Sequence, residues 1–461
     1  MPSGATPGGD HPPPDTGRPR AAHADGIASL RLVLANPAFR GVWLAGALAS
    51  AMRWLDLLVL GVFVYDLTGS AFQVGLLFFF RMAPRILLAL PLGMLSDRVS
   101  RQSMLVVTFA SLSVISAALA ALVISGRVEY WHLAIGTFLT GVFWTTEFPV
   151  RRAMIGDVVP REIVGRAFAI DIGTSAVARM LGPLTGGALL QLIGAGAAFL
   201  TQAVVLLLAM LVIASFRYVP PPRIAAPASA LADMVAGLRY VRARSLLLGA
   251  ILISFAMNLF GFPYTAMVPV IGKETLGAEP LGVGILQSAE GVGALLGATL
   301  IATLAPTRIY ARMYVLGTGF FLAMVLAFSA STGYPLSVAC LFVAGFGMAA
   351  YTAMQVTLIV AGSAPEMRGR VMGAVSLSLG GNPIGALNVG ILAGAFGAPV
   401  ATAIMAAEGL ASIALIALLF PSLRRPFALG PEQVDVPPPA AGRVRAPPAP
   451  ARGDAGPAAD P

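Results

Sequence analysis

Long apolar segments, separated by short polar loops, follow one another from about Gly41 to Phe420. Each is about as long as the roughly 20 apolar residues that a helix needs to cross a bilayer. Because lipid offers no water to backbone groups, such segments are expected to be α-helical. The pattern predicts an all-α integral membrane protein with spans at residues 41–64, 72–95, 103–124, 131–156, 164–190, 197–217, 245–270, 281–304, 310–330, 336–361, 370–396 and 399–420.

The arginines outside these twelve segments indicate which loops face the cytoplasm. They lie before the first span and after every second span, whereas the opposite loops carry Arg127 and Lys273. Positively charged residues are retained on the cytoplasmic side of membrane proteins. Because the number of spans is even, both termini are predicted to be cytoplasmic.

The composition agrees with a chain folded in lipid, since 57% of residues are hydrophobic and 11% are charged. The net charge of +9 is spread over short loops and forms no single basic stripe, so no nucleic-acid partner is predicted. Residues 1–35 and 421–461 are predicted to be disordered cytoplasmic tails rich in Pro, Ala and Gly. One lysine against 29 arginines suggests a bacterium with a GC-rich genome, and hence the inner membrane.

Internal similarity predicts two six-helix halves, at residues 36–217 and 245–420, joined by a cytoplasmic linker at 218–244. The sequence Val-Gly-Leu-Leu begins at Val74 in the second span, and Val-Gly-Ile-Leu begins at Val283 in the eighth. Internal repeats of this kind are typical of secondary transporters, whose halves rock about a central site.

The loop after the second span, Gly93-Met-Leu-Ser-Asp-Arg-Val-Ser-Arg-Gln102, resembles the G-x-L-A-D-R-x-G-R-K signature of the major facilitator superfamily. In that family the aspartate lies beside the cytoplasmic start of the eleventh helix, where free N–H groups stabilise a carboxylate. A plain surface turn is the alternative. The resemblance implies a cytoplasmic latch formed by Gly93, Asp97, Arg98 and Arg101 with Gly369 and Arg370.

The fifth span resembles the G-P-x-x-G-G element of exporters in that superfamily, and the residues that match or precede it are Arg179, Gly182, Pro183, Gly186 and Gly187. Small residues allow close helix packing, and a proline bends a helix, so plain packing is the alternative role. The resemblance implies that the fifth span packs on the eighth, and the second on the eleventh, across the halves. Over about residues 36–420 the chain resembles the macrolide-efflux and enterobactin-exporter branch of drug:proton antiporters.

Several ionisable residues lie inside the predicted spans, where they are costly unless they face a cavity or each other. Arg53 with Asp56, and Glu147 with Arg151, have the spacing that allows pairing along one helix. For Arg151, Arg152 and Asp171 the alternative is a structural role, reaching toward the cytoplasmic face. The candidates for intramembrane charge or proton coupling are Asp56, Arg81, Glu147, Arg151 and Glu290.

Arg81 and Glu290 lie near the middle of their spans without a compensating neighbour on the same helix. We expect Glu290 to lie opposite Arg179, with all three residues at the interface between the halves. A carboxylate that alternates between an arginine partner and a proton is a workable device for antiport.

Aromatic and polar residues on the predicted cavity helices are the substrate candidates: Trp144, Asn258, Tyr264, Tyr351 and Gln355. Mostly apolar walls with few polar groups suit small amphiphilic molecules. The sequence therefore predicts a monomeric exporter in the lipid bilayer, driven by proton antiport, without a cofactor, metal or enzymatic activity. The alternatives are a dedicated metabolite or lysolipid exporter or flippase, and a non-transporting membrane scaffold or sensor.

Overall fold

A computed structural model describes residues 32–88, 99–216, 218 and 230–426. Throughout these ranges the regular elements are helices, so the predicted all-α membrane fold is confirmed. Ten of the described helices are long and apolar enough to cross a membrane. One of the ten, a helix of 51 residues, covers two of the twelve predicted spans. The helix Tyr130–Val158 (α6) is not among the ten and covers one more predicted span.

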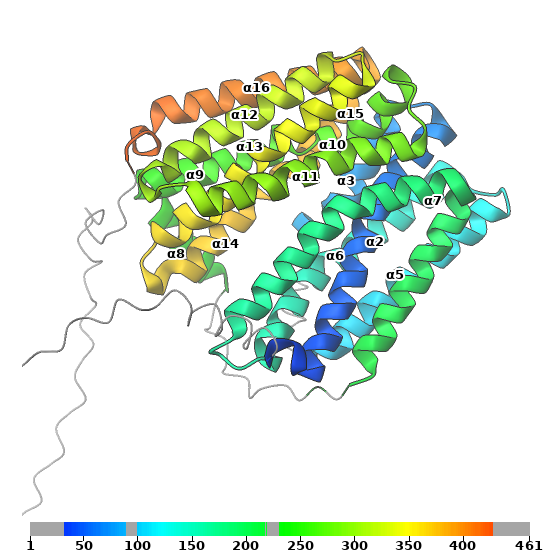
Figure 1. Ribbon diagram of the computed structural model, residues 1–461, viewed down its shortest axis with the longest axis horizontal. Helices are drawn as coiled ribbons and strands as arrows, with labels where there is room; N and C mark the ends of the chain where they lie inside the picture. Colours follow the sequence, from blue (N-terminus) through cyan, green and yellow to red (C-terminus); the bar gives the residue numbers. More distant parts are fainter. Residues whose placement is uncertain (1–31, 89–98, 217, 219–229, 427–461) are drawn as a thin grey trace, which may run out of the picture.

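The predicted N-terminal half contains α6 and four further long helices, drawn from blue to green in Figure 1: α2 (Pro37–Thr68), α3 (Ala71–Leu87), α5 (Arg101–Ile124) and α7 (Val164–Ala214). The side chain of Asn36 begins α2 by accepting hydrogen bonds from the first backbone N–H groups. Inside α7, Gly194 has a φ of 81°, which breaks the helix into the predicted fifth and sixth spans.

The linker and C-terminal half, drawn from green to red-orange in Figure 1, contain these longer helices: α8 (Ala230–Arg242), α9 (Ser245–Ala256), α10 (Tyr264–Val270), α11 (Pro280–Leu304), α12 (Tyr310–Ala330), α13 (Tyr334–Ala361), α14 (Arg368–Ser378), α15 (Gly381–Phe396) and α16 (Ala398–Leu419). Short 3-10 turns lie at Thr307–Ile309 (η3), Pro365–Met367 (η4) and Pro421–Leu423 (η5). Helix α8 lies in the predicted linker and packs on α14, where Arg370 donates to Asp233 over 2.7 Å.

The helical segment of the seventh predicted span, Ser245–Thr275, is interrupted by one wide helical turn, Met257–Gly261 (η1), and ends in a second, Ile271–Thr275 (η2), with α10 between them. Their π-type hydrogen bonds join Phe262 N to the Met257 carbonyl over 2.8 Å, and Leu276 N to the Ile271 carbonyl over 3.1 Å. Such turns occur mostly as single insertions in longer helices, frequently at functional sites. Helix α10 is therefore a short segment with an irregular turn at each end.

The two halves meet along α7 and α11 and along α3 and α15, which lie side by side in Figure 1. Glycine is needed at both seams because backbones approach closely. A Cβ on Gly187 would lie 2.4 Å from the Pro280 carbonyl oxygen, and one on Gly75 would lie 2.4 Å from the Cα of Gly390. The pairing of spans that the resemblance implied is thus confirmed.

Polar contacts also join the halves at one end of the molecule, which we call the sealed end. At the end of α2, the Tyr65 hydroxyl donates to Glu274 over 3.0 Å, and Asp66 forms an ion pair with Lys273 at 2.7 Å. The seam between α7 and α11 continues to the same end, where the Gln191 side chain accepts a hydrogen bond from the backbone of Leu281. These contacts hold α2 and α7 of the first half against η2 and α11 of the second.

Candidate functional site

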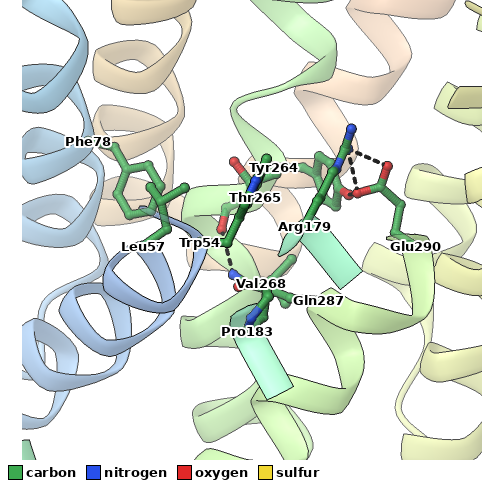
Figure 2. Close-up of a pocket in the computed structure, with 10 residues that line it drawn as sticks. All are labelled: Trp54, Leu57, Phe78, Arg179, Pro183, Tyr264, Thr265, Val268, Gln287 and Glu290. Carbon is green, nitrogen blue, oxygen red and sulfur yellow. Dashed lines mark hydrogen bonds and ion pairs between the residues drawn. The ribbon is translucent and has the colours of Figure 1, made fainter. Parts of the chain in front are cut away.

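A cavity of about 40 Å³ lies between the halves and is lined by residues from both (Figure 2). The N-terminal half contributes residues of α2, α3 and α7, and the C-terminal half contributes residues of α10 and α11. The lining residues are Trp54, Leu57, Phe78, Arg179, Pro183, Tyr264, Thr265, Val268, Gln287 and Glu290. The walls are mostly apolar and aromatic, and we call this space the central cavity.

An ion pair crosses from one half to the other at the edge of the central cavity. Arg179 Nη2 donates to both carboxylate oxygens of Glu290, over 2.7 and 3.0 Å, and the Tyr264 hydroxyl donates to Glu290 Oε2 over 3.0 Å (Figure 2). Glu290 is only 4% exposed. The expected position of Glu290 opposite Arg179 is therefore confirmed, and its carboxylate accepts from two other helices.

Close backbone packing brings this pair together. A Cβ on Gly291 would lie 3.1 Å from the Cα of Met180, so α11 and α7 are in contact one residue beyond the pair on each helix. The Arg179 guanidinium also lies 5.2 Å from the ring centre of Trp54, in cation–π range. The short distance between the helices leaves the ion pair fixed across the seam.

A second group of buried charges lies within the N-terminal half. Glu147 accepts from Arg53 and from Arg151, each over 2.5 Å, and it is 1% exposed. Asp56 accepts instead from Arg81. The expected pair of Arg53 with Asp56 along α2 is thus wrong, whereas the pair of Glu147 with Arg151 on α6 is confirmed. Charged groups on packed neighbouring helices compete with the weak pairing along one helix, so that Glu147 binds Arg53 and Arg81 binds Asp56.

The structural alternative for Asp171 and Arg151 also requires correction. Arg151 is 1% exposed and donates to Asp171, which is 2% exposed, so both lie inside the bundle and do not reach the surface. Only the Arg152 side chain extends outward, with 36% of its surface exposed. Buried charges are tolerated when they are paired, and here Asp171 forms ion pairs with both Arg151 and Arg152.

Three of the substrate candidates are used in hydrogen bonds within the C-terminal half. Asn258 donates to the Ser254 carbonyl over 2.8 Å, and Gln355 donates to the Ser254 hydroxyl over 2.6 Å and to Tyr351 over 3.0 Å. Tyr264 lines the central cavity, and Trp144 lies against Arg53 at 4.2 Å from its ring centre. A direct role of these residues in substrate binding stays a prediction.

Half of the predicted latch lies outside the described residues, because Gly93, Asp97 and Arg98 fall there. Arg101 begins α5 and donates to Asp157, to which the Tyr218 hydroxyl also donates. Burial and the hydrogen bond to Asp157 raise the pKa of Tyr218 to about 12. In the C-terminal half, the predicted latch residue Gly369 is exposed, and a Cβ placed on it would have no atom within 4 Å.

The residues of the exporter element lie where α7 packs against its neighbouring helices. A Cβ on Gly182 would lie 2.5 Å from the Cβ of Trp54, and one on Gly186 would lie 3.0 Å from the Leu55 carbonyl oxygen, so both glycines pack against α2. Pro183 lines the central cavity. The element therefore places α7 against α2 on one side and, through Gly187, against α11 on the other.

The sequence analysis missed several residues of the central cavity, notably Trp54, Phe78 and Gln287. Their side chains carry no charge, so the cost of ionisable groups in lipid gave no signal. The neighbouring Arg53 was the available clue for Trp54. In the described part of the chain, histidine, cysteine and carboxylate side chains form no group of three or more that could hold a metal ion.

Comparison with known families gives a match over most of the chain. The family model described as Major Facilitator Superfamily matches residues 42–376, with a second match at 262–452. The enterobactin exporter EntS of Shigella flexneri is 28% identical over 414 residues, covering 88% of this chain and 97% of that protein. The same exporter of Escherichia coli is 27% identical over 412 residues, with the same coverage.

Solved structures with the same fold include transporters of distant sequence. A bacterial homologue of the human lysosomal transporter Spinster, inward-facing and unoccupied, superimposes with a TM-score of 0.61 and 18% identity, covering 84% of this chain and 94% of that one. The nucleoside transporter NupG gives a TM-score of 0.64 at 12% identity, covering 83% and 99%. At these identities the comparison supports the fold alone.

Proposed function

The chain belongs to the major facilitator superfamily, and from its central cavity we propose that it exports amphiphilic organic compounds by proton antiport. A membrane transporter of this fold moves its substrate by alternating access between two halves. The kinship with enterobactin exporters supports export over import. The single observation that carries the proposed coupling is the buried ion pair of Arg179 and Glu290, which joins the two halves at the cavity.

We take the sealed end as periplasmic, because the arginine-bearing loops lie at the opposite ends of the helices. Both termini and the linker then lie in the cytoplasm, and the two six-helix halves are the moving units. In this arrangement the central cavity is closed from the periplasm by the contacts of Tyr65 and Asp66. Compounds would enter from the cytoplasm or the inner leaflet and leave when the sealed end opens.

Glu290 is the proposed proton carrier. When the sealed end opens, α7 moves away from α11 and the carboxylate loses Arg179, so a proton from the periplasm neutralises it. When the seam closes, Arg179 and Tyr264 bind the carboxylate again and the proton leaves toward the cytoplasm. Pairing and protonation oppose each other because the arginine binds the ionised carboxylate more strongly than the neutral acid.

The cavity walls support an amphiphilic substrate. Trp54, Phe78 and Val268 offer apolar and aromatic surface, whereas Thr265 and Gln287 are the neutral polar residues of the lining. Apolar walls with few polar groups bind organic molecules by burying their surface. No cofactor or covalent step is required for such transport, and the chain is proposed to act as a monomer.

The test is proton release coupled to substrate in inside-out vesicles. Vesicles are acidified inside, and candidate compounds (macrolides, dyes, siderophores and lysolipids) are added while a pH-sensitive dye reports proton efflux. We expect efflux with at least one compound in the wild type and its loss in Glu290→Gln. Glu279→Gln, at the exposed start of the same helix, is the matched control and should retain efflux. Full proton-coupled transport by Glu290→Gln would remove this carboxylate from the mechanism.

A further inference from the structure

A second cavity, of about 50 Å³, lies within the N-terminal half and is lined by three arginines. Its residues come from α2, α3 and α6: Arg53, Leu57, Arg81, Met82, Arg85, Gly141, Trp144 and Thr145. Leu57 also lines the central cavity, so the two spaces are neighbours on either side of this side chain. We call the second space the arginine cavity.

Hydrogen-bond donors of the arginine cavity lack partners among the described residues. Arg53 Nε, Arg81 Nη2 and Trp144 Nε1 are buried and make no hydrogen bond there. Arg81 and Trp144 are each 6% exposed. Most buried polar groups in proteins are hydrogen-bonded, and a buried donor without a partner is costly. Several such donors on the wall of one cavity point to a missing acceptor.

The charge of the surrounding network has the matching sign. Within the described residues of this cluster, three carboxylates (Asp56, Glu147 and Asp171) are paired with four arginines (Arg53, Arg81, Arg151 and Arg152). Arg85 is a fifth arginine and makes no ion pair or hydrogen bond with a described residue. The cluster therefore carries an excess of positive charge, which is expensive at membrane depth unless an anion offsets it.

We infer that the arginine cavity binds the anionic group of the transported compound, which makes the substrate an amphiphilic organic anion. This inference rests on the proposed export function and names its substrate class. A carboxylate, sulfonate or phosphate accepts several N–H donors at once, which matches the planar arrangement of guanidinium groups. The apolar body of the same molecule would then lie past Leu57, against Trp54 and Phe78 of the central cavity.

Arg85 gives the clearest test because no carboxylate depends on it. Substitution of Arg81 would leave Asp56 unpaired and buried, whereas Arg85→Gln removes a charge without creating an uncompensated acid. The protein is reconstituted in phosphatidylcholine nanodiscs and titrated with 6-(dansylamino)hexanoate and with its neutral primary amide. Dansyl fluorescence reports binding, so the two probes differ only in the charge of the tail.

The wild type is expected to bind the carboxylate roughly tenfold or more tightly than the amide, as for a charge-assisted hydrogen bond in a buried site. Arg85→Gln should reduce this preference to about twofold or less, while Arg85→Lys keeps most of it. Arg308→Gln, which removes an exposed arginine from the C-terminal half, should leave the preference unchanged. Equal binding of the two probes by the wild type, absent binding of the carboxylate, or an unchanged preference in Arg85→Gln overturns the inference.

Two further arms separate this inference from the proposed coupling and identify the source of the anion. Glu290→Gln should keep the preference for the anionic probe. If a variant loses proton efflux but keeps this preference, the defect lies in proton coupling. If it keeps proton efflux but loses the preference, the defect lies in the arginine cavity. Displacement of the probe by lysophosphatidate alone assigns the site to a lipid headgroup. Displacement by octanesulfonate as well assigns it to amphiphilic oxyanions in general, and failure of both competitors speaks against an anion site.

Discussion

Substitution of Gly187 by alanine should favour opening of the sealed end. A Cβ at this position would lie 2.4 Å from the Pro280 carbonyl oxygen and 3.0 Å from the Leu281 Cα, where ordinary contacts begin at 3.4 Å. Neither neighbour is the end of a flexible side chain, so α7 and α11 must separate by about 1 Å. Overpacking of this kind costs about 1–3 kcal/mol. Because the steric clash destabilises only the state in which this seam is closed, the same energy raises the population of the open state by about 5- to 150-fold.

Cysteine labelling measures this change. Val62 is fully buried between α2 and α11 at the sealed end. Because Cys340 is the only cysteine, Val62→Cys in a Cys340→Ser background gives a single thiol. With a membrane-impermeant maleimide added outside intact cells, the labelling rate follows the fraction of molecules that are open outward. Adding Gly187→Ala should raise that rate in proportion to the shift in population.

Gly173 provides the matched control on the same helix. No atom lies within 4 Å of a Cβ placed there, so Gly173→Ala should leave labelling of Val62→Cys unchanged. A Gly187→Ala rate equal to the Gly173→Ala rate would refute the argument that this contact restrains the seam. Faster labelling with loss of the folded peak in gel filtration would equally count against it, because unfolding and not opening would then expose the thiol.

Three other predictions concern stability, each followed by thermal or denaturant unfolding in detergent. Glu147→Gln should destabilise the N-terminal half by about 3–5 kcal/mol, since it removes one partner of a buried ion pair and leaves arginine charge behind. Asp56→Asn and Arg81→Gln should each be destabilising, but the double variant should cost less than their sum, and simple additivity would contradict the pair. Asp233→Asn should change stability by less than about 1 kcal/mol, because its pair with Arg370 is exposed, and a larger loss would show that α8 supports the bundle more strongly than a surface contact can.

The helical spans could be predicted from sequence because the bilayer imposes one length and one composition on each. The break at Gly194 is an example: a short loop was expected between spans 164–190 and 197–217, and a single positive φ supplies it. Helix α8 was not predicted, since it lies in a linker whose Pro-rich start gives no apolar period. Its position depends on contacts with α14, which sequence alone does not give.

The candidate site was predicted where a charge had one plausible partner across the halves, as for Glu290 with Arg179. It was not predicted where several partners competed, as when Arg53 bound Glu147 in place of Asp56. Spacing along one helix says which side chains share a face, but the strongest partner is set by the distance to neighbouring helices. Gln287 carries no charge, and the sequence gave no signal for it.

The two wide turns around α10 have a geometric consequence for the central cavity. Successive residues of an α-helix are rotated by about 100° about the helix axis. One inserted residue therefore changes the direction in which all side chains point between it and the next irregular turn. If η1 or η2 tightened to an ordinary turn, α10 would swivel about its own axis by roughly that angle. Tyr264, Thr265 and Val268 would then leave the cavity wall together, and Glu290 would lose its hydroxyl donor. Rotation of α10 about its own axis would thus change the lining of the central cavity without displacing the seventh span as a whole.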